Sequence, residues 1–463
     1  MRNHLKISLE NKKLFSLFWP ILIEQALTIL VGMVSTILVS NVGDYAVAGV
    51  NLVDTINQLI IILFNSLAVG ASVMVAQHIG AGRNGQAGQT AAQSIVLVVG
   101  ASILLGGAAF IFAEPLLNLL YGSAADNVLQ VGVIYMRFSA ISYIFLALFS
   151  ISAGVTRAAG NSRTPMMAAL LSNLVNISIA AVLIYIFHLE VYAVSIAVLA
   201  ARMVSGLFMF LTVRRVKSGP LLLPPLRLKL DLKLLRPVLN IGVPSGVDNL
   251  IFQGAKVLIS VFIAGMGTAA LQANAICNSA GGYIWLAGNA MQVAAVTMVG
   301  QAYGARLFHT AKQWMRKLSF YTAGIQVILL LPYLLVLKGL ISFYGASAAS
   351  AALAQKILMI CAIVQPFIYA WAFVLPQCLR ATGDARFTMV VSVISLIGLR
   401  LSVGWFLGIY LGWGVFGIWM GMLADWLGRA IGFIWRLEKN KWHGGKVPLD
   451  EGILEVRQNP VPQ

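Results

Sequence analysis

The sequence predicts an all-α polytopic membrane protein with twelve transmembrane helices in two homologous six-helix bundles. Composition is the first observation: 59% of the 463 residues are hydrophobic, 10% are charged, and the mean hydropathy is +0.87. A water-soluble protein of this length needs a more polar surface. The second observation is a pair of motifs that recur at a fixed spacing, and the third is the gathering of Lys and Arg in alternate loops.

The twelve spans follow from the lengths of the apolar segments. A membrane-spanning helix needs about 20 mostly apolar residues, because its backbone polar groups must be satisfied within the segment. We expect the spans of the first half at 17–40, 52–76, 92–113, 131–154, 166–187 and 191–213. Those of the second half are expected at 242–265, 270–299, 318–341, 356–378, 388–410 and 413–435.

Two motifs divide the chain into homologous halves. The segment 74–81 (MVAQHIGA) returns as 298–305 (MVGQAYGA), and 298 − 74 is 224. The segment 156–163 (TRAAGNSR) returns as 379–386 (LRATGDAR), and 379 − 156 is 223. Because each half has an even number of spans, both begin on the same side of the membrane. We therefore expect parallel repeats related by a pseudo-two-fold axis along the membrane normal, with a central cavity on that axis.

The repeat also predicts the domain organisation. A proline-rich segment with alternating Arg227 and Lys229 follows the sixth span and is expected to form an amphipathic linker along the inner face. The expected parts are an N-lobe at 1–218, this linker at 219–240, a C-lobe at 241–437 and a cytoplasmic tail at 438–463.

Basic residues orient the predicted spans. Most Lys and Arg lie before the first span, in the even-numbered loops and after the last span, whereas the opposite side carries mainly acidic residues. The positive-inside rule therefore places both termini in the cytoplasm. The formal net charge of +17 reflects this topology and contact with anionic lipid, so we expect no nucleic-acid partner.

Motifs of common enzyme classes are missing from the sequence. It has no Gly-rich phosphate loop ending in Lys-Ser/Thr and no His-Glu-x-x-His pair, and its five His are scattered. Its three Cys lack the paired spacing of a metal site or disulfide framework. We therefore expect a protein that is not an enzyme and that has no cofactor.

The repeated motifs carry a family resemblance. Gln-x-x-Gly-Ala occurs at Gln77 and Gln301, Arg-Ala-x-Gly-x-x-Arg occurs at Arg157 and Arg380, and Gly-Ile-Trp at 417–419 opens the last span. From Phe18 to Lys439 the chain resembles bacterial multidrug and toxic compound extrusion (MATE) transporters, whose superfamily includes lipid-linked oligosaccharide flippases. The resemblance implies two bundles around a V-shaped cleft in the bacterial inner membrane. It also implies cation-coupled export of amphiphilic, often cationic, compounds.

Two departures from the family pattern affect the coupling site. Many members carry Asp in the first span where this chain has Ser35, and some carry Glu in the seventh span near the position of Phe252. Neither familiar carboxylate is present. The coupling group must therefore be sought among the acidic residues that this chain has.

Glu24 and Asp248 are the leading coupling candidates. The offset of 224 places them at equivalent positions in the first and seventh spans, each followed by an amide, Gln25 and Asn249. A central acid costs roughly 2.5 to 3.5 kcal/mol, so it faces water or a basic partner. Carboxylate and amide oxygens suit Na⁺, and a carboxylate also takes a proton. The alternative is structural, because acids near cytoplasmic helix ends favour helix N-termini or cap an intracellular gate.

Two further acids lie within spans. Asp54 starts the second span near its extracellular boundary, where a structural role is favoured over coupling. Asp425 is followed by Arg429 at i+4, the spacing of a helical ion pair, and is expected to be structural.

Three cations are predicted at membrane depth. Arg202 and Arg400 do not readily lose their charge, so each is expected to pair with an acid or with carbonyls in its own bundle. Lys256 is expected to face the cleft or a C-lobe pocket and to pair with an acid or a bound anion, because an unpaired ammonium facing lipid is costly. Otherwise it extends to the membrane surface.

The remaining candidates have structural explanations. The loop glycines permit tight turns, the loop glutamines cap helix ends, and the loop arginines anchor to lipid phosphate; the residues are Gly80, Gly160, Gly304, Gly383, Gln77, Gln301, Arg157 and Arg380. Three amides within spans either line a cavity or join helices. They are Asn65, its equivalent Asn289, and Asn176.

A secondary active exporter coupled to Na⁺ or H⁺ is the favoured function. The alternative is a flippase or exporter of an anionic lipid-linked or metabolite substrate, which needs a cationic cavity. Lys256, Arg202 and Arg400 are the candidates for that cavity. A membrane-embedded enzyme is a remote third choice. We expect a monomer in contact with membrane lipid and a small-molecule substrate.

Overall fold

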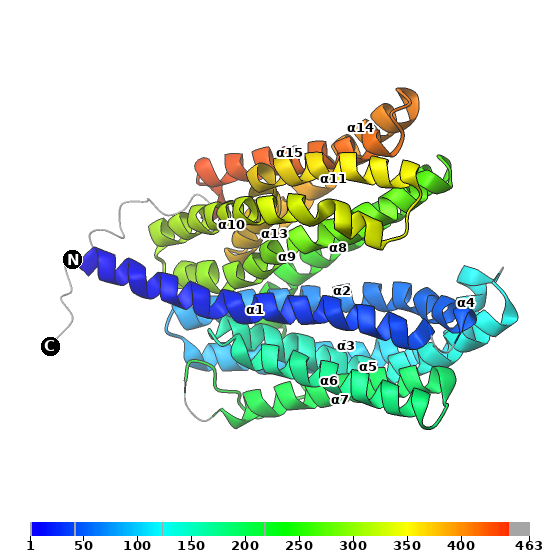
Figure 1. The fold of residues 1–463 in the computed structure, drawn as a ribbon. Helices are drawn as coiled ribbons and strands as arrows, with labels where there is room; N and C mark the ends of the chain where they lie inside the picture. Colours follow the sequence, from blue (N-terminus) through cyan, green and yellow to red (C-terminus); the bar gives the residue numbers. More distant parts are fainter. Residues whose placement is uncertain (1, 41–42, 123, 217–218, 444–463) are drawn as a thin grey trace. The chain divides into compact units, whose positions relative to one another are not determined.

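The computed structural model describes residues 2–40, 43–122, 124–216 and 219–443, and nearly all of them are helical (Figure 1). The predicted all-α class is confirmed. The chain forms two compact units, unit 1 at Met1–Val243 and unit 2 at Pro244–Gln463. The expected tail at 438–463 lies outside the described residues beyond His443.

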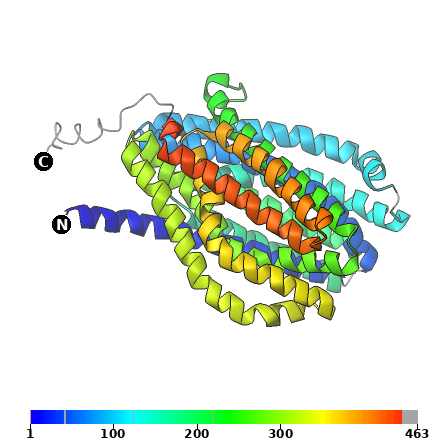
Figure 2. The same ribbon diagram turned by 90° about the horizontal axis from the view of Figure 1, so that it is seen from above.

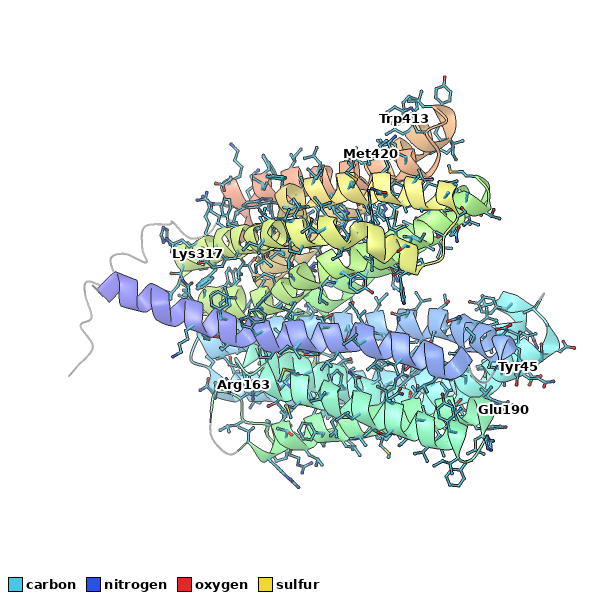
Figure 3. The ribbon with its side chains drawn as sticks, viewed as in Figure 1. Tyr45, Arg163, Glu190, Lys317, Trp413 and Met420 are labelled. Carbon is cyan, nitrogen blue, oxygen red and sulfur yellow. The ribbon has the colours of Figure 1, made fainter. Side chains whose placement is uncertain are left out.

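Unit 1 is built around α5 (Asp126–Ala158), which packs against α2, α3 and α7. The other helices are α1 (Arg2–Ser40), α2 (Asp44–Gly80), α3 (Asn84–Ile111), the short α4 (Ala113–Tyr121), α6 (Arg163–Tyr185), α7 (Glu190–Arg215) and the first turns of α8 (Leu232–Ala264). Tyr45 donates a hydrogen bond to Glu190 Oε2 (3.2 Å) at one end of the unit, and Arg163 lies at the other end (Figure 3). Glu190 and Arg163 therefore lie at opposite ends of unit 1, as the charge asymmetry of the loops predicts.

Unit 2 contains the remainder of α8 and five further long helical stretches. These are α9 (Thr268–Gly304), α10 (Phe308–Phe343), α11–η1–α12 (Ala348–Tyr369, Ala370–Val374, Leu375–Ala381), α13–η2–α14–η3 (Ala385–Ser395, Leu396–Leu401, Ser402–Trp405, Phe406–Tyr410) and α15 (Gly414–Glu438), followed by the short η4 (Lys441–His443). Figure 2 shows α15 alongside the stretch from α13 to η3, in agreement with their contacts. The segments η1, η2 and η3 are π-helical, a geometry that often marks functional sites.

The first repeated motif ends two helices of equal length. Both α2 and α9 have 37 residues. In the turn after α2, the amides of Ala81, Gly82 and Arg83 donate to the carbonyls of 77, 79 and 78 at 2.9, 3.0 and 2.9 Å. The turn after α9 repeats this pattern at 305–307 with three bonds of 3.0 Å. Gly82 has φ 70° and its equivalent Arg306 has φ 59°, so the tight turns are confirmed. Gly80 and Gly304 are instead the last residues of α2 and α9 and do not supply the positive φ.

The second motif forms an equally well matched turn. Gly160 has φ 93° and Gly383 has φ 95°. Their amides donate to the carbonyls of Arg157 (2.8 Å) and Arg380 (2.9 Å). Glycine suits both positions because a side chain is strained at such φ values.

Ten helical stretches in the described part of the chain are long and apolar enough to cross a membrane. The expected second-half spans at 270–299 and 413–435 are helical as α9 and α15 but are not among the ten. Asn and Gln side chains interrupt the apolar sequence of α9, and the pair Asp425–Arg429 interrupts that of α15. The count of twelve spans remains a prediction.

The linker is shorter than the predicted range of 219–240. Residues 219–231 are largely irregular, and α8 begins at Leu232. The Gln93 side chain on α3 donates to the carbonyls of Arg227 (3.4 Å) and Lys229 (3.2 Å) and accepts from the amide of Asp231 (2.9 Å). A Cβ on Gly88 would lie 1.9 Å from the Leu222 carbonyl oxygen. The linker therefore lies directly against α3.

Substitution of Gly383 tests the turn geometry. Gly383→Ala places a Cβ at φ 95° and should lower the free energy of unfolding by about 1 kcal/mol or more. Gly282→Ala is the control, because Gly282 lies within α9 with open space around its Cα and alanine favours a helix. Thermal unfolding in detergent should show a lower midpoint for Gly383→Ala only. Equal midpoints for the two variants would contradict the assigned conformation.

Candidate functional site

The acids and arginines of the repeated motifs form ion pairs with one another. In unit 1, Arg157 Nη2 donates to Glu24 Oε1. In unit 2, Arg380 Nη2 donates to Asp248 Oδ2. These two pairs are equivalent, since 248 − 24 is 224 and 380 − 157 is 223. Each pair ties the first span of its half to the turn after the fourth.

Burial distinguishes this arrangement from the expected contact with lipid phosphate. The side chains of Arg380 and Asp248 are 6% and 10% exposed, and Arg380 Nε also donates to Thr388 Oγ1 (3.1 Å). The expectation of lipid anchoring is therefore wrong for Arg380, because its guanidinium is enclosed by protein. Glu24 and Asp248 thus have the basic partner that the sequence analysis allowed for an acid at membrane depth.

In the described residues, the amides of Gln25 and Asn249 do not join the neighbouring carboxylates in a common site for Na⁺. Asn249 Nδ2 donates to the Ser245 carbonyl of its own helix (2.9 Å), and Gln25 is half-buried. Adjacent helical residues point about 100° apart, which separates each amide from the preceding carboxylate.

A cavity of about 370 Å³ lies within unit 1. Its wall contains residues of α1, α2, α5, α6 and α7, and its two ionisable acid and base side chains are Asp54 and Arg202. Ser35 and Asn176 line the same cavity, and Ser35 Oγ donates to Asn176 Oδ1 (3.2 Å). Asp54, for which a structural role was favoured, is thus the acid that faces open space.

Hydrogen-bond donors hold the Asp54 carboxylate. Tyr135 OH on α5 donates to Asp54 Oδ1 (3.1 Å), and Asn57 Nδ2, one turn along α2, donates to the same oxygen (3.0 Å). Tyr143 OH donates to Asn57 Oδ1 (2.7 Å) and thereby fixes the amide orientation. Arg202 Nη1 donates to Ser142 Oγ (2.7 Å). The result is a rigid polar wall inside an apolar bundle.

The sequence did not identify the partners of Asp54. Asn57, Tyr135 and Tyr143 come from two helices, and no spacing rule connects them. The repeat offset did contain one usable signal, because 54 + 224 is 278 and the equivalent residue is Asn278. The two halves therefore differ in charge at this position.

A second cavity, of about 340 Å³, lies within unit 2. Its charged and polar lining residues include Lys256, Arg400, Ser260, Asn274 and Asn278. Arg400 Nη1 lies 3.9 Å from Asp425 Oδ2, and Arg429 Nε donates to Asp425 Oδ1 (2.8 Å). The predicted pairing of Arg400 within its own bundle and the i, i+4 pair of Asp425 are both confirmed.

The equivalent amides Asn65 and Asn289 lie outside these two cavities. Both side chains are exposed in the structure. Asn289 Oδ1 accepts from Tyr369 OH (3.0 Å) and from Gln292 Nε2 (3.1 Å), so it joins helices α9 and α11. Of the three predicted amides, Asn176 lines one of these two cavities.

Comparisons with known proteins agree with the repeat and the fold. The family model MatE matches residues 20–182 and 244–406, two ranges displaced by 224. The chain is similar to the uncharacterized transporter YisQ of Bacillus subtilis (27% identity; 93% of this chain and 94% of that protein). It is also similar to the probable multidrug resistance protein NorM of Thermotoga maritima (23% identity; 96% of each). A crystal structure of MATE in the bent conformation matches with a TM-score of 0.85 at 18% identity, covering 93% of this chain and 97% of that one.

The buried pair of unit 2 is testable by a double-mutant cycle. Asp248→Leu leaves Arg380 enclosed without its carboxylate and should cost about 3–5 kcal/mol. The double variant Asp248→Leu, Arg380→Met removes both charges, so most of the lost stability should return. Thermal unfolding of the two single variants and the double variant measures this coupling. A double variant whose loss equals the sum of the single losses would exclude a direct interaction.

Proposed function

Because the chain belongs to the MatE family of membrane transporters, we propose that it exports amphiphilic organic compounds in exchange for protons. The observation that carries this proposal is the placement of Asp54 in the cavity of unit 1, with Tyr135 and Asn57 as its hydrogen-bond donors. Glu24 and Asp248 are already neutralised by arginines. Asp54 is therefore the carboxylate to which we assign coupling.

The chemistry around Asp54 favours a proton over Na⁺. A sodium ion needs several oxygen lone pairs directed at it, as other hard cations do. Tyr135 and Asn57 instead direct an O–H and an N–H at Asp54 Oδ1, and Asn57 Oδ1 is occupied by Tyr143. The positive charge of Arg202 on the same cavity further disfavours a metal cation.

Charge balance explains why proton and solute would compete. With Asp54 ionised, the charges of Asp54 and Arg202 cancel. Protonation of Asp54 leaves the cavity with a net positive charge, which disfavours a cationic solute in an environment of low dielectric. Exchange requires this reciprocal effect of one ligand on the other.

The size and lining of the cavity support a small organic substrate. A volume of about 370 Å³ falls within the usual range of roughly 300–1,000 Å³ for ligand pockets. Valines from α1, α2 and α7 supply apolar wall beside the polar groups. The name of the Thermotoga maritima relative, a probable multidrug resistance protein, supports drugs as the substrate class.

The remaining features of the proposal come from the repeat and the charge distribution. We assign the chain to the bacterial inner membrane with both termini in the cytoplasm, on the positive-inside rule. From the repeat we infer two parallel halves that work by alternating access around a shared cleft. In this scheme the pairs Glu24–Arg157 and Asp248–Arg380 hold the cytoplasmic turns. The transporter acts as a monomer and uses no cofactor apart from its coupling ion.

Replacement of Asp54 tests the proposed coupling. Asp54→Asn removes the protonatable group and should reduce efflux driven by a pH gradient at least tenfold. Efflux of a cationic dye from proteoliposomes, with an imposed H⁺ or Na⁺ gradient, measures this effect. Asp44→Asn is the control, because Asp44 is an exposed acid on the same helix, and its efflux should be unchanged.

Two outcomes would overturn this assignment. If pH-driven efflux persists in a folded Asp54→Asn variant but is lost in Glu24→Gln or Asp248→Asn, coupling belongs to the ion-paired acids. If a Na⁺ gradient alone drives efflux in the wild type, the coupling ion is sodium.

A further inference from the structure

The cavity of unit 2 has more positive than negative charge around it. The described residues of unit 2, 244–443, contain four acidic side chains. Three of these acids pair with bases that do not line the cavity. The pairs are Asp248–Arg380, Asp384–Arg436, and Glu438 with both Arg316 and Lys312. The fourth, Asp425, interacts with both Arg429 and Arg400. One carboxylate therefore serves two arginines, and no described acid pairs with Lys256.

Arg400 has donors that lack acceptors. Its residue is 7% exposed, and its Nε and Nη1 atoms have no hydrogen-bond partner among the described residues. A buried charged donor without an acceptor is costly. Arg400 also belongs to the π-helical segment η2 and lines the cavity. The guanidinium of Arg400 is therefore short of hydrogen-bond acceptors, and the residue borders an open space.

An aromatic ring compensates these cations only in part. The Phe252 ring centroid lies 5.2 Å from Lys256 Nζ, 5.1 Å from Arg400 Cζ and 5.6 Å from Arg429 Cζ. The negative face of a ring attracts a cation, but it supplies no full charge and no hydrogen-bond acceptor for a guanidinium. An anion is therefore still needed to balance the charge of these cations.

The repeat shows that this charge is specific to the second half. The offset of 224 relates Lys256 to Gly32 and Asn278 to Asp54, and all four residues line the cavities of their respective units. From the first half to the second, a carboxylate is replaced by an amide and a glycine by a lysine. Both differences raise the charge of the cavity in unit 2.

The other lining residues indicate what kind of anion fits. Ile259, Ile418, Trp419 and Met422 form an apolar wall, and the indole of Trp419 donates to Asn274 Oδ1 (3.1 Å). A volume of about 340 Å³ suits a small organic molecule. An aromatic body would stack or pack on the indole and on the polarisable methionine.

We propose that the cavity of unit 2 binds an amphiphilic organic anion. Its carboxylate accepts hydrogen bonds from Lys256 and Arg400, and its apolar body lies against Trp419 and Met422. This site is separate from Asp54 and goes beyond the proposed proton-coupled export. Binding here does not depend on the identity of the coupling ion.

The test is a binding titration with three ligands of the same shape. Purified protein in a neutral detergent is titrated calorimetrically with 1-naphthoate, with the neutral 1-naphthamide and with the cationic 1-naphthylmethylammonium. We expect naphthoate to bind at least about tenfold more tightly than the other two, as charge-assisted hydrogen bonds imply. Lys256→Met should weaken naphthoate binding about tenfold, and Asn278→Asp should weaken it similarly by supplying Lys256 with a carboxylate.

Control variants separate this proposal from the proton-coupling proposal. Lys338→Met removes an exposed lysine of α10 and should leave naphthoate affinity unchanged, as should Asp54→Asn. Without ligand, Lys256→Met should unfold at a higher temperature than the wild type, because it removes the repulsion between Lys256 and Arg400, which both lie against the Phe252 ring. Naphthoate should raise the wild-type midpoint more than that of Lys256→Met.

Three results would overturn the inference. Equal affinities for the acid, amide and ammonium ligands would exclude recognition of the charge. Unchanged naphthoate binding in both Lys256→Met and Asn278→Asp would place the ligand elsewhere. Displacement by chloride or inorganic phosphate at the concentration of naphthoate itself would make the site one for inorganic anions.

Discussion

The cost of placing charge among apolar helices is the constraint on which this structure depends. An ionised side chain at membrane depth is stable when it has an oppositely charged partner or faces a polar cavity. The pairs Glu24–Arg157 and Asp248–Arg380 meet the first condition, and Asp54 in unit 1 meets the second. Lys256 lines a cavity but has no described acidic partner. The ion-paired residues therefore hold the fold, whereas Asp54 and Lys256 are available to a ligand.

Much of the fold could be predicted from the sequence because its signals are local. Apolar segments of sufficient length predicted helices over all twelve ranges, and the repeated motif predicted tight turns at Gly160 and Gly383. The equal lengths of α2 and α9 agree with the repeat but were not predicted. The i, i+4 pair of Asp425 and Arg429 was also accessible, because helix geometry alone brings the two side chains together.

The candidate sites were harder to predict because their contacts join residues that are distant in the sequence. The repeat showed both the acids and the arginines as matched pairs, yet it did not show that they pair with each other across 133 and 132 residues. Asp54 was assigned a structural role from its position near a span boundary, whereas Tyr135 and Arg202 on other helices form the cavity wall beside it. For Lys256, the sequence predicted the cost of a charge at membrane depth, and the structure supplied the surrounding excess of positive charge.

Divergence between equivalent cavities is the central feature of this account, since one fold carries a balanced charge in one half and excess positive charge in the other. A crystal structure with 4-bromo-1-naphthoate, analysed by the anomalous scattering of bromine, tests it most directly. The account predicts a bromine peak in the cavity of unit 2, with the carboxylate against Lys256 and Arg400, and none in the cavity of unit 1. A peak beside Asp54, or an empty unit 2 cavity at saturating ligand, would contradict it.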